Sequence, residues 1–547
     1  MTNKITLIIL LLSLIGHTQN TIGTISIEEG VYDAYTLATV HTESYLINNC
    51  GEIINQWTSD YLPGTSVYLL PNGNLLRPGR LDDGSSDIGF GGQGGIVELF
   101  NWEGDKIWEY VYSSNSFRQH HDVYPLPNGN VLILAATVVE GTDAIQAGRN
   151  PALLSETNLY NERIFEIEPN GSNGGTVVWE WNAIDHVIQD FDNTKDNFGV
   201  VADSPEKIDI NFLNGNDPEL NWLHINSIQY NEDLDQIVIS TRNLCEIWII
   251  DHSTTTAEAA SSSGGTYGKG GDLLYRWGNP QAYGQGDASD QKLFGQHTPY
   301  IIPNGLPNAG KLMVFNNGFR RSPSFSQVDI INPPTSAPGF YQYTPGTAYG
   351  PSTTDFTFPE IPPFEDSEFY SAIVSNAQQL PNGNILVCEG REAIFFELDN
   401  DNNIVWEYLL PVSNADGTLY EQGDAPPVNA FSFRAIKYPL DYEAFDGRDL
   451  TPGDTIELNP DLSPCQLLGT EEDNFTNLSL YPNPSRDFIT VRSANPITSI
   501  SLFNMNGQLL STQTGINRID LRPIENGIYF VQISNDLGTV TKKVIKK

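Results

Sequence analysis

The sequence predicts an all-β chain in which a six-bladed β-propeller is followed by a small C-terminal β-sandwich. Three observations predict this class. Asn-Gly turns recur between short apolar runs, polar turns that lead into aromatic-ended strands recur beside them, and no long helix-periodic stretch occurs. An Asn-Gly pair favours a tight hairpin because both positions tolerate positive φ. Short strands repeated over several hundred residues are typical of a propeller.

Hairpin turns and aromatic-ended strands mark the blades. The turns are at 70–74, 126–130, 230–235, 302–310 and 380–384. The aromatic-ended strands are at 51–57, 104–110, 174–181, 271–277 and 402–408. A degenerate copy is expected around 341–343. A sixth inner strand at 431–442 follows the last full blade, whereas the chain begins with outer-type strands at 44–48 and 51–57. We therefore expect the C-terminal strand to complete the N-terminal blade, because closure hides both sheet edges.

The charge balance excludes one class of partner. The 547 residues include 28 Lys+Arg and 68 Asp+Glu, a net charge of −40. Nucleic acid is not an expected ligand, since binding it requires a basic surface. The acidity is typical of a solvated extracellular surface. Acidic runs at 190–196 and 399–403 lack the EF-hand pattern, so turn-rich loops are the simpler interpretation, with calcium binding left open.

The N-terminus predicts export. Lys4 precedes an apolar run from Ile5 to Ile15, which is too short to span a bilayer but suits the core of a secretory signal peptide, expected at 1–19. No later apolar run is long enough to span, so we expect no transmembrane segment in the mature protein.

Export makes disulfides possible for the four cysteines, which allow three full pairings. Cys50 lies in the closing blade and Cys465 just beyond its last strand, so this pair is one option for clasping the ring. Cys245 and Cys388 are the other two, and buried free thiols are the alternative for any of the four.

Three histidines share one register relative to the turns. His121, His224 and His297 each lie seven residues before the asparagine of their hairpin, and Thr65 and Ser375 occupy the equivalent positions in two other hairpins. A ring of blades would point such side chains at one centre. The histidines at positions 17, 41, 186 and 252 lack this register and are taken as incidental. Three imidazoles can bind zinc, but neighbouring arginines disfavour a dication, so we expect no metal.

Arginines are expected on the same rim. Residues equidistant from a hairpin turn lie opposite one another, which pairs His224 with Arg242 and Thr65 with Arg80. The guanidinium fork matches tetrahedral oxyanions, so a rim of imidazole and guanidinium favours an anionic substrate. The arginines predicted on this rim are Arg80, Arg242, Arg320 and Arg391.

Histidine and arginine together point to group transfer without a cofactor. Neutral imidazole is a nucleophile toward sulfur or phosphorus, and imidazolium can protonate a leaving oxygen. Arginines can stabilise the oxygens of a group in transit. Transfer of a sulfuryl or phosphoryl group fits this set.

The motifs HHDVYPLPNGNVL, NWLHINSIQY with IVISTRN, and GQHTPYIIPNG with FNNG resemble the bacterial arylsulfate sulfotransferases, and the resemblance covers residues 30–442. Members of that family are six-bladed propellers that move sulfate between phenols without a nucleotide donor. The best-known members carry an additional N-terminal β-sandwich, for which this chain has no room, so the resemblance does not extend to a family dimer arrangement or to the upper wall of the pocket. The resemblance implies a phenolic sulfate donor, a phenolic acceptor and ping-pong transfer through a sulfohistidine.

The resemblance also implies roles for individual residues. His297 would be the nucleophile, His224 and Arg242 would bind and polarise the sulfuryl oxygens, and His121 would donate or accept a proton. The choice of His121 over its neighbour rests on the turn register. The remaining predicted substrate-binding residues are Asn226, Arg80, Arg320 and Arg391.

The last part of the chain has its own β-pattern. The segments LSLYPNPSRDFITV, ISLFNMNGQLL, IENGIYFVQIS and TVTKKVIKK resemble the type A C-terminal sorting domain of the type IX secretion system. The resemblance implies that this secretion machinery is a partner and that the protein is secreted or held at the cell surface. The expected division is a signal peptide at 1–19, a propeller at 20–466, a linker at 467–477 and a sorting domain at 478–547.

Two other functions fit a propeller. One is a non-catalytic surface protein that binds glycans or proteins. The other is a lyase or lactonase on the same scaffold, which more often requires a bound metal. Fold alone does not decide among these alternatives.

Overall fold

The computed structural model describes residues 20–155, 157–360, 367, 369–428, 430–463, 465, 478–481, 483, 485–493, 496–504, 508–515, 517–535 and 538–547. The chain forms two compact units that divide between Asp461 and Leu462. The predicted signal peptide and the predicted linker lie outside the described residues. Strands predominate throughout, and the α-helices of the described chain are the short α1 (Gly141–Gln146) and α2 (Thr256–Ala259), which confirms the all-β prediction.

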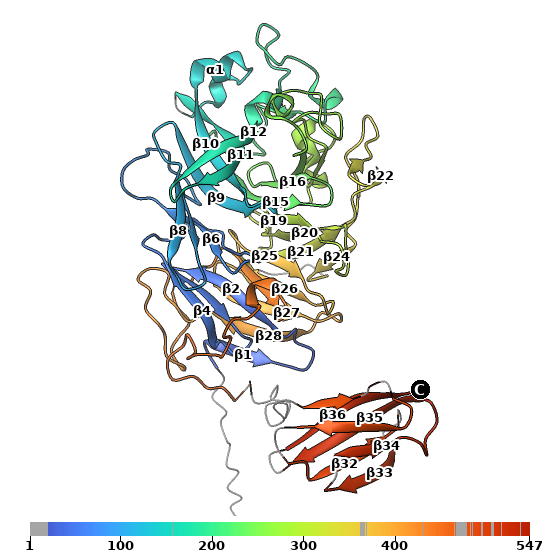
Figure 1. Cartoon of the computed structure of the whole chain (residues 1–547). Helices are drawn as coiled ribbons and strands as arrows, with labels where there is room; N and C mark the ends of the chain where they lie inside the picture. The colour runs from blue at the N-terminus through green and yellow to red at the C-terminus, as the bar shows by residue number, and fades with distance from the viewer. Residues whose placement is uncertain are drawn as a thin grey trace, which may run out of the picture. The chain divides into compact units, whose positions relative to one another are not determined.

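Six antiparallel sheets follow one another along the described part of the larger unit (Figure 1). The first three, in strand order, are β29 (Ala435–Pro439), β2 (Ala34–Val40), β3 (Glu43–Ile47) and β4 (Ile53–Thr58); β5 (Tyr68–Leu69), β6 (Leu75–Arg80), β7 (Gly95–Phe100) and β8 (Lys106–Val111); and β9 (Phe117–Pro125), β10 (Val131–Glu140), β11 (Asn158–Asn170) and β12 (Gly174–Asn182).

The other three sheets repeat this order. They are β15 (Ile225–Asn231), β16 (Gln236–Thr241), β17 (Glu246–Asp251) and β18 (Tyr275–Trp277); β19 (His297–Ile301), β20 (Leu312–Asn316), β21 (Gln327–Ile331) and β24 (Phe356–Phe358); and β25 (Asn376–Gln379), β26 (Ile385–Glu389), β27 (Ile394–Leu398) and β28 (Ile404–Leu409), with β1 (Gly23–Ile27) added at the β28 edge. The five predicted turns join the first two strands of the second to sixth sheets.

The last strand of the larger unit joins its first sheet. The C-terminal strand β29 belongs to this sheet as predicted, but its direct neighbour is β2 rather than the strands at 44–58. The sequence analysis missed β2 because its turn to β3 is His41–Thr42, with His41 at φ 51, and carries no Asn-Gly signal. A second correction concerns the fifth sheet. Its outer strand is β24, whereas the predicted 341–343 region lies at β23 (Phe340–Tyr341), which pairs with β22 (Thr335–Ala337) in a separate sheet.

The first strands of the sheets pack against one another. β9, β15 and β19 are in contact in turn, and β25 contacts both β19 and β29. They pass through the middle of the larger unit, where β9, β15, β19 and β25 follow one another in Figure 1. Tyr438 of β29 accepts a hydrogen bond from the N–H of Leu69 in β5 at 3.0 Å. The inner strands of neighbouring sheets therefore lie beside one another.

Tryptophans join neighbouring sheets. In five of the sheets an outer-strand tryptophan donates its indole N–H to a backbone carbonyl of the next sheet along the ring order, at 2.7–2.9 Å. A buried indole usually needs such a partner, so each bond also fixes the spacing of two sheets. The donor–acceptor pairs are Trp57–Asn101, Trp108–Gly174, Trp181–Gly271, Trp277–Pro351 and Trp406–Asn49.

Two of the cysteines are oxidised. Cys50 and Cys465 are each disulfide-bonded. Cys245 and Cys388 are buried free thiols.

The smaller unit is a pair of facing sheets, as the sequence predicted. Its core is apolar and includes Ile489, Leu502 and Val531. The strands are β30 (Ser479–Tyr481), β31 (Phe488–Arg492) and β34 (Arg518–Asp520) in one sheet, and β33 (Leu509–Thr514), β32 (Ser499–Phe503), β35 (Gly527–Asn535) and β36 (Gly538–Lys546) in the other.

A buried ion pair joins the closing strand to the sixth sheet. Lys437 Nζ of β29 lies 2.5 Å from Glu397 Oε2 of β27, and both side chains are fully buried. The ammonium group also lies 4.3 Å from the ring centre of Trp406. Removing one partner leaves the other charge buried without compensation, which is far more costly than removing both.

We predict that Lys437→Met lowers the free energy of unfolding by about 3–5 kcal/mol, because Glu397 loses its buried partner. The double variant Lys437→Met/Glu397→Gln should recover most of this loss, since no buried charge remains. Urea denaturation of the three proteins measures the effect. A double variant no more stable than Lys437→Met contradicts it.

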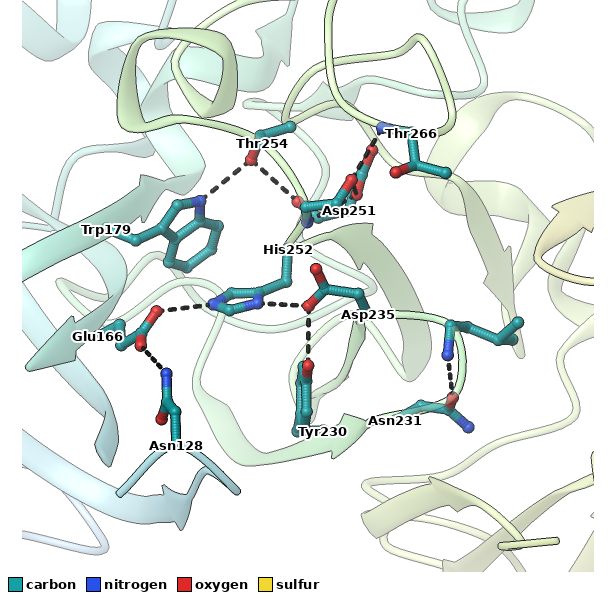
Figure 2. A network of polar contacts seen from close by, with 12 residues as sticks. Asn128, Glu166, Trp179, Tyr230, Asn231, Asp235, Asp251, His252, Thr254 and Thr266 are labelled. Carbon is teal, nitrogen blue, oxygen red and sulfur yellow. Dashed lines mark hydrogen bonds and ion pairs between the residues drawn. The ribbon is translucent and has the colours of Figure 1, made fainter. Parts of the chain in front are cut away.

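A protonated histidine links the third and fourth sheets (Figure 2). His252 Nδ1 lies 2.7 Å from Asp235 Oδ1, and Nε2 lies 3.2 Å from Glu166 Oε2. Burial lowers the pKa of His252, but these two carboxylates outweigh it and raise the pKa from 6.5 to about 9. Tyr230 and Asn128 donate to the same carboxylates, as Figure 2 shows. The residue that lacked the turn register therefore has a structural role.

We predict that the contribution of His252 to stability depends on pH. Because the folded pKa is raised, the stabilisation is complete below pH 6.5 and is lost as the pH rises through about 9. Its size is at most about 3 kcal/mol. The difference in unfolding free energy between wild type and His252→Gln, followed across this range, measures it, with His41→Gln as the control. A difference that does not change with pH contradicts the prediction.

Candidate active site

A left-handed residue lies near the start of four inner strands and in the middle of a fifth, β9. Non-glycine residues rarely adopt this conformation. The pairing register of β9, β15 and β19 shifts at the same place, so successive side chains no longer alternate between faces. The positions are those of the predicted register or, in β19, one residue later: Thr65 (φ 102), His121 (φ 50), His224 (φ 48), Thr298 (φ 50) and Ser375 (φ 87).

Backbone hydrogen bonds beside these left-handed residues confirm one predicted cross-strand pair and show that another is wrong. Arg242 donates its backbone N–H to the carbonyl of His224 at 3.1 Å, so these residues lie opposite one another as predicted. Arg80, however, donates its N–H to the carbonyl of Leu62, not of Thr65. Counting from the turn assumes a regular ladder, and the left-handed residue at Thr65 breaks it.

The proton of His297 is on Nδ1. Asn317 uses its amide nitrogen to donate to the carbonyls of Ser371 and Val374, at 2.7 and 2.8 Å, so its Oδ1 faces the histidine as an acceptor. His297 Nδ1 lies 2.7 Å from that oxygen and therefore donates to it. The lone pair is then on Nε2, which accepts the N–H of Val374 at 3.1 Å.

His224 has the opposite tautomer. Asn221 Oδ1 accepts the backbone N–H of His224 at 3.2 Å, which turns the amide nitrogen of Asn221 toward His224 Nδ1 at 3.4 Å. Because that amide is a donor, Nδ1 holds the lone pair and Nε2 carries the proton. His224 is therefore a hydrogen-bond donor, while His297 offers a lone pair.

His121 lies against His224 and under a glycine-rich loop. The two imidazole centres are 4.9 Å apart. The backbone N–H of His121 donates to the carbonyl of Gly92 at 2.7 Å, and a Cβ at Gly92 would lie 2.2 Å from His121 Nε2, so this position requires glycine. Phe90 of the same loop packs on His121 and His224, with ring centres 6.3 and 6.1 Å away. Among the described side chains, this loop forms a wall of the site.

Two arginines stack on Phe319. The guanidinium carbons of Arg242 and Arg320 lie 4.2 and 5.2 Å from its ring centre. Arg320 also donates to Asn216 at 2.6 Å. The guanidinium of Arg242 has no hydrogen bond or ion pair with any residue that the structure describes, so its donors are available to a ligand.

The other predicted substrate-binding residues are placed differently. Arg80 pairs with Asp82 at 2.8 Å and Arg391 with Glu392 at 3.6 Å, and all four side chains are exposed. Within the described chain, no polar or ring contact joins either arginine to the three histidines. Asn226 is fully buried and donates to the carbonyl of Gln296 at 2.8 Å.

All three histidines are held neutral. Burial, followed by the positive charge of Arg242, lowers the pKa of His297 to about 3. Burial and Arg242 likewise hold the pKa of His224 well below its usual range. The pKa of His121 is well below the ordinary value because of burial and then the neighbouring His224 and His120, with smaller effects of His297 and Arg242. At neutral pH the site therefore combines uncharged imidazoles with cationic guanidinium groups.

A second buried network lies beside the histidines. Arg434 donates to Asp122 at 2.8 Å and to the hydroxyl of Tyr68, and it contributes to lowering the pKa of His297. Arg434 and Tyr68 also line a cavity of about 790 Å³ on the turn side of the inner strands. The three histidines do not line this cavity. Nothing in the turn register pointed to Asp122 or Arg434.

Neither a metal site nor a membrane-spanning helix is found in the described chain. No group of three or more His, Cys, Asp or Glu side chains there is arranged to hold a metal ion. The helices of the same residues are too short or too polar to cross a bilayer.

An unpartnered guanidinium and a lone pair on a buried neutral imidazole equip a site to transfer an anionic group. The family model of the arylsulfotransferases (ASST) matches residues 79–412, more than half of the chain, and the protein belongs to this family of transferases. The model of the secretion system C-terminal sorting domain matches residues 479–547. The protein is therefore directed by type IX secretion to the cell surface or the extracellular space.

No curated protein sequence matches this chain. Among solved structures, a protein of unknown function from Bacteroides caccae is 11% identical with a TM-score of 0.39, covering 74% of this chain and 98% of its own. A periplasmic gluconolactonase from Pseudomonas aeruginosa is 8% identical with a TM-score of 0.33, covering 93% and 99%. A virginiamycin B lyase from Staphylococcus aureus is 10% identical with a TM-score of 0.32, covering 72% and 89%.

Proposed function

We propose that the protein is an arylsulfate sulfotransferase that moves a sulfuryl group from a phenolic sulfate ester to a phenolic acceptor through a sulfohistidine at His297. The observation that carries the proposal is the pairing of His297 Nδ1 with Asn317, which leaves the lone pair on Nε2 of a neutral ring. The unpartnered guanidinium of Arg242 and the Nε2–H of His224 supply donors for the sulfuryl oxygens. Family membership supports the same reaction.

In the first half-reaction, Nε2 of His297 forms a bond to sulfur as the bond from sulfur to the phenolic oxygen breaks. The electron pair of that bond leaves with the phenolate. Arg242 and His224 stabilise the sulfuryl oxygens in the transition state. In the first turnover the oxygen leaves as phenolate, and in later cycles it takes the proton that His121 removed from the acceptor of the preceding cycle.

In the second half-reaction an acceptor phenol occupies the position of the first. His121 takes its proton as the phenolic oxygen bonds to sulfur, and the electron pair of the N–S bond returns to His297. The proton removed from the acceptor is the one available to the next leaving phenolate, so the cycle balances. This order gives ping-pong kinetics without a nucleotide or a metal.

The resting hydrogen bond of His297 Nε2 constrains the first step. The N–H of Val374 points at this lone pair from a left-handed backbone at Val374 and Ser375, so it has to move aside before Nε2 can attack sulfur. Once the N–S bond has formed, the same N–H is free to donate to a sulfuryl oxygen. Strained backbone of this kind is commonly found at functional sites.

The six sheets support a closed ring around this site. We propose that they are the blades of a six-bladed propeller within residues 20–466, followed by a linker and the sorting domain. The pairing of β29 with β2 completes the first sheet with the last strand of the larger unit. The indole bond from Trp406 to Asn49 and the ion pair of Lys437 with Glu397 join the sixth sheet to the first. Closure leaves no sheet edge open between them.

We predict that incubation with 4-nitrophenyl sulfate alone adds about 80 Da to the wild-type protein and nothing to His297→Ala, because no other group carries the sulfuryl. Intact-mass spectrometry measures the adduct, which should be lost on mild acid treatment. His41→Ala, which replaces a histidine outside the site, should gain the mass. Addition of this mass to His297→Ala overturns the assignment. A wild-type protein that neither gains mass nor releases nitrophenolate in the presence of phenol overturns the function and favours a non-catalytic binding protein.

We predict that Arg242→Ala lowers kcat about 100-fold or more, because its donors act mainly on charge that develops in the transition state. Steady-state rates with 4-nitrophenyl sulfate and phenol measure the loss. Arg163→Ala is the control, since Arg163 pairs with Glu180 on outer strands. An Arg242→Ala variant that raises KM with kcat unchanged assigns the arginine to ground-state binding instead.

A further inference from the structure

Two adjacent histidines of β9 are hydrogen-bonded to each other. Residues next to one another in a regular strand point to opposite faces. Here the register shifts between the pairs Ile133–Val123 and Ala135–Gln119, and His121 is left-handed with φ 50. The shift brings His120 Nδ1 within 2.9 Å of His121 Nδ1. This backbone irregularity therefore creates the contact.

A carboxylate at the far side completes a chain. His120 Nε2 lies 2.9 Å from Glu162 Oε2, and both side chains are fully buried. The other oxygen of Glu162 accepts the N–H of Ile225 at 3.0 Å, next to His224. Both oxygens of the Glu162 carboxylate thus have a hydrogen-bond partner, which fixes the carboxylate between the third and fourth sheets.

The donors and acceptors fix the proton positions. A carboxylate accepts, so His120 Nε2 donates to Glu162. With His120 neutral, its Nδ1 accepts the proton on His121 Nδ1, which leaves the lone pair of His121 on Nε2, the nitrogen beside Gly92. His121 Nε2 is therefore ready to accept a proton, whereas His224 Nε2 is a donor.

We propose that Glu162 and His120 are positioning residues of a proton relay that makes His121 the base for the acceptor phenol. This proposal rests on the proposed sulfuryl transfer. When Nε2 of His121 takes the phenolic proton, the proton on its Nδ1 moves to Nδ1 of His120. One positive charge then lies on His120 beside Glu162, and His121 is neutral again with its proton on Nε2. The reverse movement returns the proton to the next leaving phenolate.

The relay resolves an electrostatic conflict. A positive charge on His121 faces His224, His297 and Arg242. The pKa of His121 is well below its ordinary value because of burial and then of His224, His120, His297 and Arg242. A charge on His120 instead lies 2.9 Å from a buried carboxylate. Phe90 packs edge-on against His120, with ring centres 4.8 Å apart, and keeps water from the pair. Moving the proton from His121 to His120 therefore replaces an unfavourable positive charge on His121 with an ion pair between His120 and Glu162.

Glu162→Gln tests the relay without changing its shape. The N–H of Ile225 needs an acceptor, so the amide oxygen turns to it and the amide nitrogen donates to His120 Nε2. His120 then donates from Nδ1, and His121 carries its proton on Nε2, where it no longer accepts one. We expect transfer from 4-nitrophenyl sulfate to phenol to fall about 100-fold or more. The single-turnover release of nitrophenolate, which needs no proton, should stay within a few-fold of wild type.

The acceptor series distinguishes the relay from a structural effect. With acidic phenols such as 4-cyanophenol, assayed at mildly alkaline pH where they are ionised, the Glu162→Gln defect should shrink, because no base is needed. His120→Asn should fall between wild type and Glu162→Gln and show the same recovery, since its Oδ1 can still accept from His121 Nδ1. If Glu162→Gln does not fold, the transfer rates of His120→Asn test the relay in its place. Glu180→Gln, at a carboxylate on the next strand, is the control.

Three results overturn the relay: equal transfer rates in wild type and Glu162→Gln, a loss of both half-reactions together, or a defect that is the same for all acceptors. None of them affects the assignment of His297. Failure of the proposed function is a separate result, in which wild type itself releases no nitrophenolate.

Discussion

The left-handed backbone of the inner strands, in the middle of β9 and near the start of the others, is the constraint on which the site depends. Each such residue costs about 1–3 kcal/mol and persists only when its surroundings hold it. The kinks are held by one another. The hydroxyl of Thr65 donates to the carbonyl of His121, and the hydroxyl of Thr298 donates to that of Ser375 at 2.9 Å. Neighbouring sheets therefore fix the irregularity together, and the side chains it redirects share one centre.

Burial has two effects on the chemistry of these side chains. It keeps the imidazoles neutral, which leaves a lone pair on His297 for attack at sulfur. It also makes any extra positive charge beside Arg242 costly. A site that needs both a nucleophile and a proton acceptor must therefore place the accepted proton elsewhere. The buried pair of His120 and Glu162 is such a place, and it is reached through one hydrogen bond.

The sequence predicted the parts of the fold that have a local signal. Asn-Gly turns gave the hairpins, and their register identified His121, His224 and His297. The predictions of cross-strand partners were wrong where the backbone departs from a regular hydrogen-bond ladder. The partner of Arg80 shifted from Thr65 to Leu62 because a left-handed residue has no signature in a single sequence.

Long-range partners were also beyond the sequence. His120 stands next to His121 in the sequence, but the turn register selects His121 and says nothing of a role for His120. Glu162 lies 42 residues further along the chain, and nothing near it in the sequence indicates its bond to His120. Arg434 reaches Asp122 across 312 residues, a contact that only the closure of the first sheet creates.

The charge of the whole protein appears at first to oppose an anionic substrate, since the net charge is −40. Exposed charges are screened over roughly 8 Å at physiological ionic strength, so the distant acidic surface has little effect inside the site. What a sulfate ester meets there is local. Arg242 and Arg320 stack on Phe319, and the histidines beside them are neutral. Protonated histidines would add attraction for the donor but remove the lone pair that attacks it. In the proposed reaction the site therefore relies on guanidinium groups, which stay charged, for binding the sulfuryl oxygens, and on imidazoles, which stay neutral, for the chemistry.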